Sequence, residues 1–138
     1  DPFAGNPHSI APGTGRTTGM TPTIVYKDGK PVLVIGAPGA TRIVTAVLQV
    51  ILNRIDFGMS ISDAVHAARF DCQGDTIYCQ SRIPEFVCEE VRQRHPIERV
   101  PQSHGAFALV SAIAIDEQSG DLTGAADTGG EGMALLVP

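Results

Sequence analysis

The sequence predicts an α+β fold, in which stacked antiparallel sheets are flanked by helices. Two observations favour it: strand-like segments pair across short turns, and helix-period segments group together instead of alternating with each strand. The chain has 138 residues, of which 43% are hydrophobic, so it is long and apolar enough for one packed core. We therefore treat residues 1–138 as a single domain fragment.

The first strand pair is predicted at Thr23–Tyr26 and Pro31–Ile35. Asp28-Gly29 lies between the two strands, and this dipeptide favours a type I′ hairpin because both central residues need a positive φ. The second strand is apolar at successive positions, unlike a strand with one wet face. We therefore expect it to be a central strand that is covered on both faces.

A helix is predicted from about Thr41 to Phe57, where Gly58 is well suited to end it. Its polar residues recur three or four positions apart and form one narrow stripe. We therefore expect the helix to be buried over most of its circumference. The stripe consists of Arg42, Thr45, Gln49, Asn53 and Asp56.

The remaining elements follow from caps, prolines and apolar runs. We expect a helix capped by Ser60 and ending near Arg69, a strand at 76–80, a helix at 84–94, and strands at 107–115 and 122–125. Residues 1–22 are rich in proline and glycine, which predicts an irregular segment. A long irregular segment of this kind is expected to line a pocket.

Composition excludes several classes of function. The formal net charge of −5 argues against a nucleic-acid partner, which requires a basic surface. No apolar run reaches the roughly 18 residues of a membrane span. The three cysteines match no zinc-ligand spacing, so we expect no metal and interpret them as reduced thiols used as small apolar residues.

The turn Gly36-Ala37-Pro38-Gly39-Ala40-Thr41 is the principal candidate site. It lacks the lysine of a phosphate-binding loop and the spacing of a dinucleotide fingerprint. Backbone N–H groups at the start of a helix can instead stabilise negative charge, as an oxyanion hole does. The alternative is a tight turn that only needs small residues.

Asp127-Thr128-Gly129 has the triplet of aspartic proteases, but its context argues against that function. Ala125-Ala126 precede it in place of a strongly apolar strand, and only nine residues follow the triplet. The four histidines are far apart in the sequence, and no nucleophile with an adjacent base is recognisable.

A series of motifs, taken in order, resembles the C-terminal part of the small subunit of the gamma-glutamyltranspeptidase family. The resemblance covers nearly the whole chain and rests on the motifs occurring together. The segments are 19–25 (GMTPTIV), 36–43 (GAPGATRI), 47–49 (VLQ), 56–59 (DFGM), 64–70 (AVHAARF) and 124–127 (GAAD).

The resemblance implies an N-terminal nucleophile hydrolase with an αββα sandwich. In that family the precursor cleaves itself, and the new N-terminal threonine attacks a γ-glutamyl amide to form an acyl-enzyme without any cofactor. Here that threonine would lie upstream of Asp1, where the chain starts without methionine. We therefore expect a fragment that needs the large subunit and the rest of the small subunit as partners, and that is inactive alone.

The resemblance also assigns site residues. Gly39 and Ala40 occupy the positions of the oxyanion hole, with Ala40 in place of a glycine. Thr18-Gly19 stands where the family has a serine pair that holds the substrate carboxylate, so one hydroxyl is lost. A glutaryl-type acylase, or a non-catalytic binding or structural member of the fold, therefore stays open as an alternative.

Two expectations concern the surroundings of the chain. Its strand edges and apolar faces should make the isolated fragment self-associate. The resemblance leans toward a periplasmic location without determining it.

Overall fold

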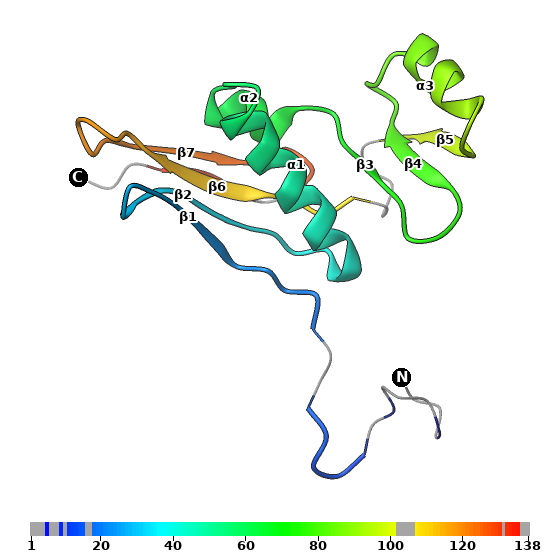
Figure 1. Cartoon of the computed structure of the whole chain (residues 1–138), viewed down its shortest axis with the longest axis horizontal. Helices are drawn as coiled ribbons and strands as arrows, with labels where there is room; N and C mark the ends of the chain where they lie inside the picture. The colour runs from blue at the N-terminus through cyan, green and yellow to red at the C-terminus, as the bar shows by residue number, and fades with distance from the viewer. Residues whose placement is uncertain are drawn as a thin grey trace.

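The computed structural model describes Gly5, Ser9 and residues 11–15, 18–101, 107–130 and 132–135. Figure 1 shows a four-stranded sheet with helices α1 and α2 on one face, and a smaller sheet beside them. Residues 11–15 lie apart from this body in the same view. The layered α+β class predicted from the sequence is confirmed.

The larger sheet has the order β1-β2-β6-β7, and all neighbouring strands are antiparallel. Its strands are β1 (Thr23–Lys27), β2 (Lys30–Gly36), β6 (Ser111–Ile115) and β7 (Leu122–Ala126). Lys27 pairs with Lys30, and Asp28 and Gly29 between them have φ values of 49° and 77°. The predicted two-residue hairpin is therefore confirmed.

Helices α1 (Ile43–Ile55) and α2 (Ile61–His66) cover one face of this sheet. Ser60 caps α2, because its hydroxyl accepts the Asp63 N–H at 3.0 Å and donates to the Asp63 carboxylate at 2.6 Å. Helix α2 ends at His66 instead of Arg69, since Ala67 turns to ψ 144°. That early end releases Arg69 from the helix.

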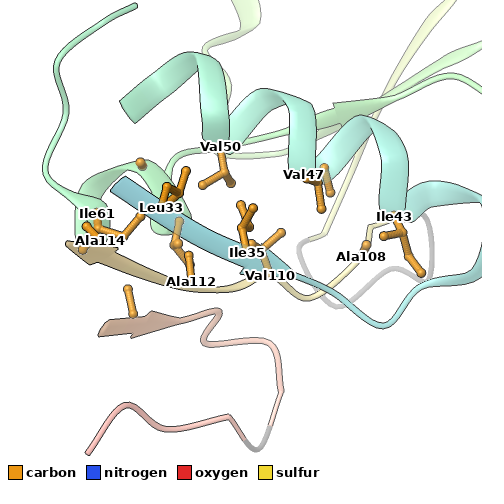
Figure 2. Close-up of a cluster of buried hydrophobic side chains, with 14 residues drawn as sticks. Leu33, Ile35, Ile43, Val47, Val50, Ile61, Ala108, Val110, Ala112 and Ala114 are labelled. Carbon is orange, nitrogen blue, oxygen red and sulfur yellow. The ribbon is translucent and has the colours of Figure 1, made fainter. Parts of the chain in front are cut away.

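The core lies between the helices and the sheet. In Figure 2, Ile43, Val47 and Val50 of α1 point toward Leu33 and Ile35 of β2. Residues at alternate positions of β6 complete the layer, because side chains of a strand alternate between its faces. The buried set is Leu33, Ile35, Ile43, Ala46, Val47, Val50, Ile61, Ala64, Val65, Ala108, Val110, Ala112, Ala114 and Ala125.

Strand β2 is central, as predicted, but its second face is open within the described part of the chain. Leu33 and Ile35 are buried, whereas Val34 between them is 38% exposed. Val34 lines a groove of about 780 Å³ together with Ile113, Leu122 and the C-terminal residues Met133 and Leu135. The expectation that both faces are covered is therefore wrong for this chain taken alone.

Helix α1 is also less buried than the prediction that most of its circumference is covered. Its exposed side carries four apolar residues, Val44, Leu48, Leu52 and Ile55. The middle of the predicted polar stripe instead faces protein: Gln49 bonds to the backbone of Phe70, and Asn53 donates to the carbonyl of Ala64. Periodicity locates the two faces of a helix but not which face meets the protein.

The smaller sheet has the order β3-β4-β5, with β3 (Phe70–Asp71) antiparallel and β5 (Ile97–Val100) parallel to β4 (Ile77–Gln80). Helix α3 (Glu85–Arg92) connects β4 to β5. The sequence did not predict β3 or β5. This second sheet is mixed and lies beside α1 in Figure 1, not stacked on the four-stranded sheet as an antiparallel partner.

Two of the three cysteines lie in the interior between β4 and α3. Cys79 and Cys88 are buried free thiols whose Sγ atoms are 3.5 Å apart. Burial raises the pKa of Cys79 to about 11, so this thiol stays protonated at neutral pH. These two serve as small apolar residues, as predicted, whereas Cys72 is exposed.

Across the residues that the structure describes, no helix is long and apolar enough to span a bilayer. The same residues contain no group of three or more His, Cys, Asp or Glu side chains arranged to hold a metal ion.

Candidate active site

The turn between β2 and α1 is shaped by a close approach of two backbone segments. Leu109 N–H donates to the Pro38 carbonyl at 3.1 Å, which fixes the segment 107–110 beside the turn. Gly39 has φ 148°, and a Cβ added there would lie 2.4 Å from the Ala108 Cβ. Position 39 therefore requires glycine both for its conformation and for its space.

Ala40 follows with φ 53°, in the left-handed region that favours glycine. It begins a short 3-10 turn, Ala40–Arg42, in which Arg42 N–H donates to the Gly39 carbonyl at 3.1 Å. Within the described residues, the N–H groups of Gly39 and Ala40 have no acceptor. Two unpaired N–H groups thus lie next to each other where the helix begins, and Ala40 is exposed.

Thr18 and Gly19 lie beside this turn. A Cβ added at Gly19 would be 2.8 Å from the Ala40 carbonyl oxygen, so the two backbones touch. The Thr18 hydroxyl accepts the Met20 N–H at 3.1 Å, which stabilises the bend of this segment. The structure therefore brings the two predicted site segments together, although 20 positions separate Gly19 from Gly39 in the sequence.

A buried ion pair supports the other side of the turn. Arg69 and Asp127 are both almost fully buried and form a salt bridge. Arg69 also donates to the carbonyls of Val65 at 2.6 Å and Ala108 at 3.3 Å. Since Ala108 is the residue that touches Gly39, the guanidinium holds the segment against which the turn packs.

Asp127 does not resemble a protease aspartate in this setting. Its Oδ2 pairs with Arg69, and its Oδ1 accepts the Gly129 N–H at 2.9 Å. A carboxylate fixed in this way has a structural role, which agrees with the rejection of an aspartic protease.

A second carboxylate, Asp71, reaches the turn from β3. Its Oδ1 accepts the Thr45 hydroxyl at 2.5 Å and the Gln73 amide at 3.2 Å. Its Oδ2 is 3.9 Å from Nε of Arg42, the residue that closes the 3-10 turn. Both Asp71 and Arg69 thus join a distant segment to the backbone around Gly39 and Ala40.

Sequence reasoning did not identify Asp127 and Asp71 as parts of the site. Arg69 and Asp127 lie in motifs that were noted, and the available signal was a charged residue within an otherwise apolar motif. Asp71 gave no signal beyond following Phe70, because its partners Arg42 and Thr45 come from another element.

Of the histidines, His66 Nε2 contacts the Ala126 carbonyl at 3.0 Å and His95 is exposed, while His8 and His104 lie outside the described residues.

The layered fold and its strand-to-helix turn define the class of protein as an N-terminal nucleophile hydrolase fold. The family model of gamma-glutamyltranspeptidase matches residues 3–137. The chain belongs to this family, as its motifs indicated.

Relatives with known names agree with this assignment. The Acylase ACY 1 proenzyme of Pseudomonas sp. (strain SE83) is 37% identical over 138 residues, covering 99% of this chain and 24% of the relative. The Glutathione hydrolase proenzyme of Bacillus subtilis (strain 168) is 33% identical, covering 99% of this chain and 23% of the relative. The chain therefore spans about a quarter of the length of these proenzymes.

Solved structures share the fold. The gamma-glutamyltranspeptidase of Pseudomonas nitroreducens complexed with L-DON superposes with a TM-score of 0.80 at 30% identity, covering 98% of this chain and 70% of that one. The T380A mutant of the Helicobacter pylori enzyme gives a TM-score of 0.81 at 34% identity, covering 92% and 69%.

The conformation of Ala40 leads to a first prediction. Ala40→Gly removes a left-handed strain of about 1–2 kcal/mol, partly offset by the larger entropy of glycine in the unfolded chain. We expect a gain of up to about 1 kcal/mol in the free energy of unfolding, measured by urea denaturation. Ala37→Gly in the same turn, where φ is not positive, should lose stability; equal effects of the two changes would contradict this account.

The buried pair leads to a second prediction. Arg69→Met leaves the Asp127 carboxylate buried without its cation, which should cost about 3–5 kcal/mol of stability. Arg69→Met combined with Asp127→Leu should cost less than either single change, because no buried charge is left unpaired. Denaturation of the four proteins measures this coupling, and additive losses would show that the ion pair is not the source of the effect.

Proposed function

We propose that this chain is part of the small subunit of a gamma-glutamyltransferase-like amidohydrolase or acyltransferase whose nucleophile lies outside the chain. One observation carries the proposal: Gly39 and Ala40 present two adjacent N–H groups without acceptors, beside Thr18 and Gly19. An oxyanion hole needs this arrangement of fixed donors.

The chemistry follows from those donors. The hydroxyl of an N-terminal threonine adds to the amide carbon, and its own α-amino group takes the proton. The carbonyl oxygen becomes an oxyanion, which the N–H groups of Gly39 and Ala40 stabilise by roughly 3 kcal/mol per donor. The amine then leaves with a proton, and water or an acceptor amine takes the acyl group from the ester.

Thr18 and Gly19 are proposed to line the acyl pocket. Thr18 offers one hydroxyl, while Gly19 offers none and lies against the Ala40 carbonyl. The loss of one hydroxyl that would bind the substrate carboxylate leaves the identity of the acyl group open. A glutaryl-type acylase is the second candidate, and a relative named as an acylase supports it.

The remainder of the precursor is the proposed partner of this chain. The open sheet face at Val34 and Ile113 and the apolar side of α1 expose large hydrophobic residues that a partner would cover. Relatives of about four times this length are proenzymes, which fits a partner from the same precursor. The chain alone is proposed to be inactive and to self-associate through these faces.

The test uses the full-length protein that carries this chain, purified without tags. We expect intact mass and N-terminal sequencing to show two chains, with the smaller one beginning at threonine, serine or cysteine upstream of Asp1. The processed protein should release aniline from γ-glutamyl and glutaryl anilides, and the ratio of the two kcat/KM values decides between the two acyl classes.

A single uncut chain without turnover would overturn the hydrolase proposal and favour a non-catalytic member of the fold. Processing together with turnover of neither anilide would reject both acyl classes while keeping the autoprocessing.

The contact of Gly19 with Ala40 leads to a further prediction. Gly19→Ser restores the second hydroxyl of the family motif, but its Cβ meets the Ala40 carbonyl at 2.8 Å and must displace the turn. We expect kcat for the preferred anilide to fall about 10-fold or more, since misplacing donors by a fraction of an ångström weakens transition-state binding. Gly15→Ser, where an added Cβ meets nothing, is the matched control. An increase in γ-glutamyl turnover would contradict this reading.

A further inference from the structure

We propose that Asp71 is a positioning residue: through Arg42 and Thr45 it holds the first turn of α1, and so orients the N–H groups of Gly39 and Ala40. The inference rests on the proposed function, because it concerns the donors of the same oxyanion hole. It adds a residue that comes from a separate sheet.

The contacts of Asp71 converge on one turn of the chain. Oδ1 accepts the Thr45 hydroxyl, and that hydroxyl also lies 3.1 Å from the Arg42 carbonyl. Oδ2 faces Nε of Arg42 at 3.9 Å. One carboxylate therefore contacts both the side chain of Arg42 and the group that bonds to its backbone.

Because the Asp71 carboxylate is buried, it needs a cation close to it. The Asp71 side chain is only 3% exposed, and within the described residues its sole ion-pair partner is Arg42. Neither Asp71 Oδ2 nor Arg42 Nε makes a hydrogen bond in that part of the chain. A buried carboxylate needs its cation close by, so the electrostatic attraction restricts where Arg42 can lie.

Arg42 transmits this restraint to the donors. Its N–H bonds to the Gly39 carbonyl, and the N–H of the next residue, Ile43, bonds to the Ala40 carbonyl. Ala40 is held in a left-handed conformation that costs about 1–2 kcal/mol for a residue with a side chain. A turn of that kind needs an external restraint, and Asp71 supplies one.

Strand β3 is anchored to α1 by other contacts, which makes the carboxylate separable from the strand. The Gln49 side chain accepts the Phe70 N–H at 3.1 Å and donates to the Phe70 carbonyl at 2.8 Å. Replacing the Asp71 side chain should therefore leave β3 in place while it removes the charge beside Arg42.

The experiment compares Asp71→Asn with wild type in the full-length protein. Asparagine keeps an acceptor for Thr45 but removes the anion that faces Arg42. We expect kcat per active site, counted from the burst of released aniline, to fall about 10- to 100-fold while KM changes less than about threefold. Asp71→Glu should recover part of the loss. Asp75→Asn makes the same charge change on an exposed loop residue and should leave kcat unchanged.

A second readout does not depend on catalysis. Hydrogen exchange followed by mass spectrometry should show faster exchange of the Arg42 and Ile43 amides in Asp71→Asn, and unchanged exchange in Asp75→Asn. Unchanged kcat per active site, even with a lower Tm, would overturn the inference. If the wild-type protein has no turnover, the proposed function fails, and unchanged exchange at Arg42 and Ile43 would then overturn the positioning claim by itself.

Discussion

The buried pair of Arg69 and Asp127 is the interaction on which the rest of the structure depends. It joins the segment after α2 to the end of β7, which is 58 positions away in the sequence. The same guanidinium holds the Ala108 carbonyl, and Ala108 leaves no space for a side chain at Gly39. The position of the turn is therefore fixed by a charge pair that does not touch it.

Asp71 contacts Arg42 and Thr45, which follow the same turn in the chain. Both carboxylates accept hydrogen bonds at Oδ1, but Oδ2 of Asp127 pairs directly with Arg69, whereas Oδ2 of Asp71 faces Arg42 at 3.9 Å. A fully satisfied pair rigidifies its surroundings, and a longer pair leaves some freedom.

Local signals in the sequence were sufficient for the parts of the fold that short segments determine. Asp28-Gly29 set the hairpin and Ser60 capped α2, because positive φ and side-chain caps are properties of a few adjacent residues. Strand β3 has only two residues and exists through its pairing with β4, so no pattern within it was available. The polar side of α1 was found, but its direction depended on Phe70 and Asp71, which come later in the chain. The adjacency of Gly19 and Ala40 followed only from the resemblance to a family, since no local rule joins a loop to a distant turn.

The apolar surfaces of the chain support the proposal that it packs within a larger protein. Val34 and Ile113 line the groove on the open sheet face, and Val44 and Leu48 are exposed on α1, which covers the other face of the sheet. A protein that folds alone places such residues on one side only, because leaving both faces in water forfeits roughly 25 cal/mol for each Å² of apolar surface. A layer that is apolar on both sides fits the proposal that this chain forms part of a larger sandwich in the full-length protein. In such a sandwich the turn at Gly39 and Ala40 would lie where a segment from outside this chain can deliver the reacting group.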